Sequence, residues 1–182
     1  MPRKKNKRTP FFGGMIAFIV MIAQGFAVTG HCADPFAAIP VPKEPVVLSV
    51  SGMIANHNAD GRAEFDLATL MSYPSSHIST TTAWTEGINT FEGIAAETLL
   101  NIVQANGTIA EFSALNDYTV SINLDDPIKH GAIIAYLHNG QRMSVRDKGP
   151  LWLIYPLDSN PELQSPIYRD RMIWQLRSIN VK

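Results

Sequence analysis

The chain contains 182 residues, of which 46% are hydrophobic and 17% are charged, and its formal net charge at pH 7 is −1. All 16 acidic residues lie after position 33, whereas 5 of the 15 basic residues lie before it. The later part of the chain is therefore acidic, which excludes nucleic acid and anionic membrane surfaces as expected partners. About 150 residues remain after position 33, an ordinary size for one domain with one hydrophobic core.

Residues 1–33 have the three-part organisation of a secretory signal peptide. Basic residues between Arg3 and Arg8 precede an apolar run from Phe11 to Val28, and small residues follow. We expect cleavage after Gly30 or Ala33 and export to the periplasm by the general secretory route, because the basic region has no twin-arginine pair. A transmembrane anchor is the alternative, since the apolar run is close to the roughly 17 residues that cross a bilayer.

Cys32 is the only cysteine of the chain. Its place at the processing boundary raises the alternative of a lipid-modified N-terminus, although His31 replaces the small residue that such processing needs. A single cysteine cannot form an intramolecular disulfide, so the hydrophobic core must hold the fold. A chain exported unfolded also cannot carry a cofactor with it.

The expected domain covers residues 46–182. Residues 34–45 contain four prolines, which fix backbone angles and remove donors, so we expect an extended lead-in there. Hydrophobic alternation and strand-forming residues predict strands over residues 46–54, 63–65, 77–84, 117–124, 132–137, 151–155 and 173–181.

Two helices interrupt these predicted strands. Asp66 is placed to cap a short helix that ends before Pro74, and the apolar residues between Gly93 and Val103 fit one helix face. Asp60-Gly61 and His138-Asn139-Gly140 are typical of hairpin turns. The pattern predicts an α+β domain that is mainly β, with packed sheets.

Several motifs occur in one order along this domain. They are Phe91-Glu-Gly93-Ile before a Leu-Leu helix, Asp117-Tyr118 before a strand, Gly149-Pro150-Leu, and a closing strand from Trp174 to Val181. In this order they resemble the sulfite oxidase-type molybdopterin-binding domain across nearly all of residues 46–182. The resemblance implies a sulfite oxidase-like fold with mixed sheets and two or three short helices, and it makes molybdopterin the candidate cofactor.

The chain departs from that family at the metal site. The family's metal-binding cysteine precedes the aromatic–x–glycine element and falls here within Thr80–Trp84, where no residue supplies a thiolate. Hydroxyls are poor substitutes for soft sulfur donors. We therefore expect an exported domain that binds a small ligand without redox chemistry, as the accessory of a membrane-bound sensor protein. The alternatives are an active molybdopterin-dependent oxidoreductase with a non-cysteine metal site and a purely structural or interaction module.

Basic residues supply the first group of candidate site residues. Arg146 and Lys148 flank the glycine–proline turn, and Arg169 and Arg171 precede the last strand. Together they could form a rim that binds a small anionic ligand, because arginine forks suit sulfo groups and phosphates. The alternative is solvated charge, since aspartates alternate with these residues in the sequence.

Aromatic and polar residues supply the second group, which would line a pterin-like pocket for a heterocyclic ligand. The loop Trp84–Gly87 matches the loop that frames the family's active site, and loops on a rigid scaffold often carry function. Six aromatic residues could line a pocket for a planar ligand, namely Trp84, Phe91, Tyr118, Trp152, Tyr155 and Trp174. For at least half of them, core packing is the alternative. The full set of candidate pocket residues is Thr82, Trp84, Glu86, Asp117, Tyr118, Arg146, Lys148, Trp152, Arg169 and Arg171.

No candidate metal ligands or catalytic residues are assigned from the sequence. The histidines that follow residue 33 are scattered and lack the close spacing of metal ligands. Glu86, Glu92 and Asp117 are candidate acids or bases, but no nucleophile accompanies them, and a cap or surface role is the alternative.

Overall fold

The computed structural model describes residues 38–182. The expected signal peptide, Cys32 and the first part of the proline-rich lead-in lie outside these residues. Within residues 38–182, no helix is both long enough and apolar enough to span a bilayer.

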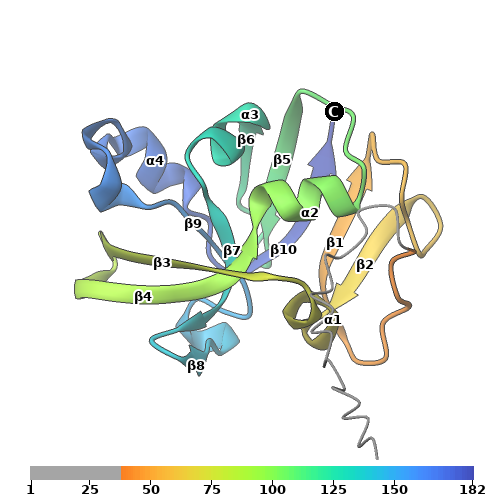
Figure 1. Cartoon of the computed structure of the whole chain (residues 1–182), viewed down its shortest axis with the longest axis horizontal. Helices are drawn as coiled ribbons and strands as arrows, with labels where there is room; N and C mark the ends of the chain where they lie inside the picture. Colours follow the sequence, from red (N-terminus) through yellow and green to blue (C-terminus); the bar gives the residue numbers. More distant parts are fainter. Residues whose placement is uncertain (1–37) are drawn as a thin grey trace, which may run out of the picture. The chain divides into compact units, whose positions relative to one another are not determined.

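Five strands form a first, mixed sheet in the order β2-β1-β10-β5-β6. Their bounds are β1 Val46–Gly52, β2 Arg62–Asp66, β5 Ile109–Ala114, β6 Thr119–Asn123 and β10 Leu176–Val181. The first and last strands, β1 and β10, run parallel, and Ser49 pairs with Ser178. The other pairs are antiparallel. The end of the chain thus completes the sheet that its first strand begins (Figure 1).

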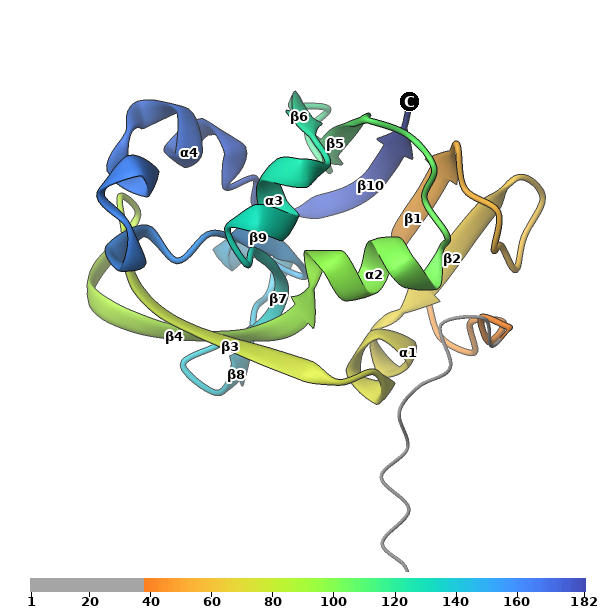
Figure 2. The same ribbon diagram turned by 45° about the horizontal axis from the view of Figure 1, so that its top comes forward.

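A second sheet contains β3, β4, β7 and β8 in that order, and β9 also pairs with β7. The bounds are β3 Ser75–Thr82, β4 Thr85–Ala95, β7 Ile133–His138, β8 Gln141–Arg142 and β9 Trp152–Ile154. β3 and β4 form a long hairpin, and its far end lies on the same side of the domain as α4 (Figures 1 and 2). This hairpin brings Trp84, which lies in its turn, to the candidate site.

Four short helices connect the strands, namely α1 Leu67–Ser72, α2 Ala96–Ile102, α3 Asp125–Lys129 and α4 Pro166–Arg171. Three 3-10 turns lie at Val145–Asp147, Leu157–Ser159 and Pro161–Gln164. The expected class, an α+β domain that is mainly β, is confirmed.

Asp66 begins α1 and also holds the lead-in. Its carboxylate accepts hydrogen bonds from the backbone N–H groups of Thr69 at 2.7 Å, Lys43 at 2.8 Å and Glu44 at 3.1 Å. The hydrogen bonds from Thr69, followed by those from the lead-in, hold the pKa of Asp66 far below its usual range despite burial. One carboxylate therefore caps the helix and ties the chain before β1 to the domain.

The helix expected from Gly93 begins instead at Ala96. Gly93 and Ile94 belong to β4, where Gly93 pairs with Ala135 of β7. A Cβ atom on Gly93 would collide with the backbone of Ile134. The glycine of the aromatic–x–glycine motif therefore permits close approach of two strands, and the apolar residues before Ala96 face the core from a strand.

Other differences concern elements that the sequence patterns did not predict. β5, α3 and α4 were not expected, and β4 extends back to Thr85 through a polar stretch. The expected strand at 173–181 begins only at Leu176, because Gln175 adopts a positive φ of 52° that interrupts the extended backbone.

One hydrophobic core is formed by residues from both sheets, and it includes the large buried side chains of Phe65, Phe91, Phe112 and Trp152. The indole Nε1 of Trp152 donates to the carbonyl of Met172 at 3.0 Å, and Leu153 N–H donates to Ile173 at 3.0 Å. These bonds attach the segment before β10 to β9 and fix the backbone that forms one wall of the candidate site.

Candidate functional site

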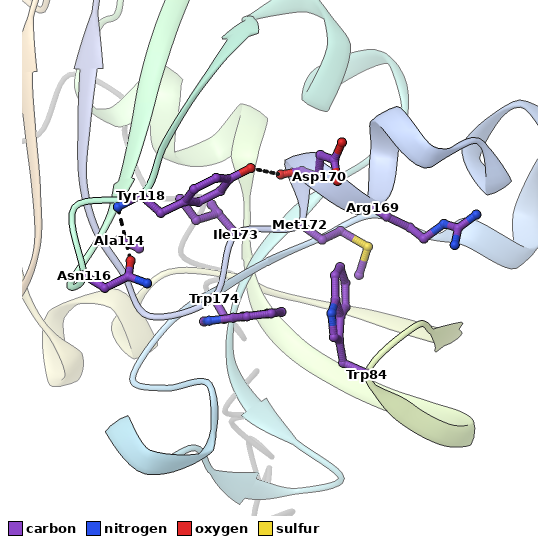
Figure 3. A pocket seen from close by; sticks show the side chains of 9 residues that line it. All are labelled: Trp84, Ala114, Asn116, Tyr118, Arg169, Asp170, Met172, Ile173 and Trp174. Atoms are coloured by element: carbon purple, nitrogen blue, oxygen red, sulfur yellow. Dashed lines mark hydrogen bonds between the residues drawn. The ribbon is translucent and has the colours of Figure 1, made fainter.

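A pocket of about 290 Å³ lies where four segments meet. These segments are the β3–β4 turn, the β5–β6 turn, the end of α4, and the chain that leads into β10. The residues that line it are Trp84, Ala114, Asn116, Tyr118, Arg169, Asp170, Met172, Ile173 and Trp174 (Figure 3). Its volume is near the lower end of the range of about 300–1,000 Å³ that is usual for small-molecule sites.

Two tryptophans form adjoining walls of the pocket. The rings of Trp84 and Trp174 lie at 86° to each other with centroids 5.0 Å apart. Both indoles also make edge contacts with Trp152, at centroid distances of 6.0 Å and 6.4 Å. Trp152 is completely buried, whereas Trp84 and Trp174 are half-buried. The buried indole therefore supports two others that face the pocket.

The hairpin turn fixes the position of Trp84. Thr82 Oγ1 accepts a hydrogen bond from Trp84 N–H at 3.1 Å and lies 2.8 Å from the hydroxyl of Thr85. Threonine hydroxyls commonly satisfy backbone groups of turns in this way. Thr82, a candidate pocket residue, thus orients the turn and does not line the pocket.

The side chain of Asn89 holds the same turn through hydrogen bonds. This side chain is almost fully buried, at 6% exposure. Its Nδ2 lies 3.0 Å from Thr85 Oγ1 and from the carbonyls of Glu86 and Gly87. Its Oδ1 lies 2.8 Å from His138 Nε2 and accepts from Asn139 Nδ2 at 2.9 Å. Because a buried amide with satisfied partners is costly to disturb, this network makes the Trp84 turn rigid.

Tyr118 lines the opposite side of the pocket from the β5–β6 turn and is 48% exposed. Its hydroxyl donates to the carbonyl of Asp170 at 3.4 Å, and its N–H donates to Asn116 Oδ1 at 3.2 Å (Figure 3). These contacts link the turn to α4. Asn116 then presents its Nδ2 toward the Trp174 side of the pocket.

The four basic candidates occupy different environments. Only Arg169 lines the pocket. Arg171 forms an ion pair of 2.7 Å with Asp126. Lys148 lies 5.7 Å above the Trp152 ring and 3.6 Å from Asp147, and Arg146 is exposed on a 3-10 turn.

Arg171 belongs to a partly buried polar cluster in which Asp126 is the shared acceptor. Asp126 accepts from Tyr155 at 2.9 Å and from Tyr168 at 3.2 Å, and Tyr168 lies 3.2 Å from His130 Nε2. Burial, followed by the charge of Asp126, raises the pKa of both tyrosines. The phenols therefore stay neutral and donate. This saturated cluster joins α3 to α4 and has a structural role.

The remaining candidates lie beside the pocket. Glu86 is exposed in the hairpin, and its backbone carbonyl accepts a hydrogen bond from Asn89 Nδ2. Asp117 has a positive φ of 64° in the β5–β6 turn and pairs with Arg177 at 2.7 Å. Trp152 supports the walls from within the core. Of the candidate set, the structure brings Trp84, Tyr118 and Arg169 together at the pocket.

Several lining residues escaped the sequence analysis, namely Ala114, Asn116, Asp170, Met172 and Ile173. Ala114 ends β5 and Asn116 follows it, and β5 was not predicted. Asp170 lies in α4, which was also not predicted, and Met172 follows that helix. Ile173 was interpreted as the start of a strand. Trp174 was noted as an aromatic candidate, and its bridge to Trp152 is the contact that sequence spacing does not reveal.

Comparisons with known proteins support the fold. No known protein family and no curated protein matches the sequence. Among solved structures, the chain is similar to the sulfane dehydrogenase SoxCD from Paracoccus pantotrophus, with a TM-score of 0.56 and 14% identity. The match covers 79% of this chain and 40% of that one, so the chain spans less than half the length of its neighbour. The likeness concerns the fold, and it supports the sulfite oxidase-like architecture that the motifs predicted.

The residues of this chain do not fit a molybdenum cofactor. Cys32 is the only thiol of the sequence, and the segment that the sequence resemblance places at the family's metal ligand carries Thr80, Thr81 and Thr82. Thr80 Oγ1 is buried and accepts from the N–H of Asp158 at 3.1 Å, while Thr81 donates to the Asp158 carboxylate at 2.7 Å. These hydroxyls already have partners and lack soft sulfur. Among residues 38–182, no group of three His, Cys, Asp or Glu could hold a metal.

Proposed function

We propose that this protein is an exported, non-redox module that binds a small ligand in the pocket lined by Trp84 and Trp174. The observation that carries the proposal is a preformed aromatic pocket beside a segment that supplies no thiolate. Small-ligand sites are typically concave and mostly apolar, with a few placed polar groups. Asn116, Arg169 and Asp170 are the polar groups here.

Rigidity of the pocket supports a binding role. Trp152 fixes both indoles from behind, and Asn89 fixes the turn that carries Trp84. Because binding then requires little ordering of side chains, the loss of conformational entropy on association is small. A pocket of this kind retains affinity for a small ring compound without any covalent chemistry.

Export and partnership complete the proposal. The basic and apolar leader supports release into the periplasm, where the domain would act as the ligand-reading accessory of a membrane-bound sensor protein. Its acidic composition after position 33 argues against a nucleic-acid partner.

Metal and pterin analysis tests the non-redox role. The full chain is produced with its leader in cells supplied with molybdate, and the exported protein is analysed by mass spectrometry for metals and for pterin released on denaturation. We expect neither molybdenum nor pterin above trace amounts. Molybdenum near one atom per chain would overturn the proposal and make the protein an oxidoreductase with a non-cysteine metal site.

A further inference from the structure

We infer that the ligand of this pocket is an uncharged planar heterocycle that stacks on an indole and accepts a hydrogen bond from Asn116. The inference rests on the proposed binding function and specifies its ligand class. It decides between the anionic and the heterocyclic ligands that the sequence leaves open.

Charge at the pocket is balanced. Arg169 and Asp170 are consecutive in α4, and both line the pocket. Neither side chain forms an ion pair or a side-chain hydrogen bond within residues 38–182, and both charged groups extend away from the rings of Tyr118 and Trp174 (Figure 3). One basic and one acidic residue thus border the pocket, and their charges sum to zero. The lining therefore gives no net preference for an anion or a cation.

Other basic side chains near this end of the domain do not add to Arg169. Arg171 is neutralised by Asp126 at 2.7 Å, and its side chain is only 18% exposed. Arg177 is paired with Asp117 at 2.7 Å. Binding of an anion without a cluster of arginines or backbone donors is weak, because its desolvation is not compensated. The structure therefore does not assemble the cluster of free basic side chains that an anion-binding rim needs.

The walls favour a ring. Aromatic side chains have a negative face and a positive edge, so they prefer offset-stacked and edge-to-face contacts. Trp84 and Trp174 are perpendicular at 86°, so one planar ring that stacks on either indole presents its edge to the other. Tyr118 and the side chain of Met172 line the same space (Figure 3). A flat aromatic ligand satisfies both walls at once.

Asn116 supplies the polar contact. Its Oδ1 accepts from the Tyr118 N–H at 3.2 Å, which fixes the amide orientation and leaves Nδ2 on the Trp174 side of the pocket. Asn116 is exposed, and its Nδ2 has no protein partner within the described chain, so it is free to donate to an acceptor of a bound ligand. A ring nitrogen or ring carbonyl accepts such a hydrogen bond, so a heterocycle is favoured over a hydrocarbon.

Matched probes with one ring system test this inference by isothermal titration calorimetry of the full chain. The probes are quinoxaline, which is uncharged with two acceptor nitrogens, quinoxaline-2-carboxylate, protonated quinoxalin-2-ylmethylamine, and naphthalene, which lacks acceptors. We expect quinoxaline to bind at least tenfold more tightly than each of the other three. Tighter binding of either charged probe would overturn the ligand class and leave the binding function standing. Absence of binding by all four would overturn the binding function itself.

Substitution of Asn116 separates the hydrogen bond from the aromatic contacts. Asn116→Asp retains the oxygen that accepts from Tyr118 N–H and removes the Nδ2 donor. We expect this variant to lose about fivefold or more in quinoxaline affinity, consistent with about 1 kcal/mol for one hydrogen bond, with unchanged naphthalene affinity. Equal losses for both probes, or no loss for quinoxaline, would contradict the role of Asn116.

Discussion

The indole rings of Trp84 and Trp174 meet at 86° with their centroids 5.0 Å apart, although the two residues are 90 positions apart in the sequence. One comes from a hairpin turn of the second sheet, and the other from the segment that leads into the first sheet. Trp152 lies behind both. This packing relationship creates the pocket, and the following predictions depend on it.

Replacement of Trp84 by Ala should remove one wall of the pocket. We expect quinoxaline affinity to fall at least tenfold, because a stacked or edge contact between aromatic rings contributes about 0.5–1.5 kcal/mol beyond area burial. Calorimetric titration measures this change. Ile88→Ala is the matched control, since Ile88 lies on the same hairpin, is 74% exposed and is not part of the pocket. A similar loss in this control would show that the hairpin, and not the Trp84 ring, determines affinity.

Asn89→Ala should act through the position of Trp84. Loss of the amide frees the turn that Asn89 bonds at Thr85, Glu86 and Gly87, so we expect about 2 kcal/mol lower stability and weaker quinoxaline binding. Thermal unfolding measures the loss of stability. Calorimetric titration below the melting transition, where the variant is folded, measures the loss of quinoxaline affinity. His77→Ala, on the neighbouring strand, should change neither. Quinoxaline affinity identical to wild type in folded Asn89→Ala would refute a positioning role.

Arg171→Ala should destabilise the fold. Arg171 and Asp126 are 18% and 17% exposed, and removal of one partner of a buried pair costs about 3 kcal/mol. Arg146→Ala, on the exposed 3-10 turn, should change stability by less than about 0.5 kcal/mol. Urea unfolding measures both. Equal and small effects would return Arg171 to the list of ligand-binding candidates.

The Asp66 carboxylate should make the domain sensitive to acid. Its pKa is lowered in the folded state, mainly by hydrogen bonds from Thr69. The resulting stabilisation is therefore complete above the unfolded-state pKa of about 3.9 and decreases as the pH falls below it. Asp66→Asn removes the charge and should be less stable than wild type at pH 7, with the difference shrinking toward pH 2. A difference that does not depend on pH would exclude this linkage.

Local sequence signals predicted much of the fold. Asp66 was identified as a helix cap from its place before an apolar stretch, and the His138–Gly140 turn connects β7 and β8 as expected. Gly149, like Gly93, lies where a Cβ would collide with another backbone, here that of Met143. The motif glycines thus report close packing, which a short sequence pattern conveys well.

The site was predicted less completely because it depends on contacts between distant segments. The sequence indicated Trp84, Tyr118 and Arg169, but spacing alone could not show that Arg171 turns toward Asp126. Residues two positions apart on an α-helix do not face the same side, so Arg169 and Arg171 of α4 project in different directions. An anion-binding rim was a reasonable hypothesis from composition, and tertiary packing separates its members.

A crystal structure of the protein with bound quinoxaline tests the central claim most directly. We predict that the ring lies in the pocket lined by Trp84 and Trp174, stacked on one indole, with a ring nitrogen within hydrogen-bond distance of Asn116 Nδ2. Quinoxaline bound at another place, with this pocket left without it, would contradict the assignment of the pocket as the ligand site.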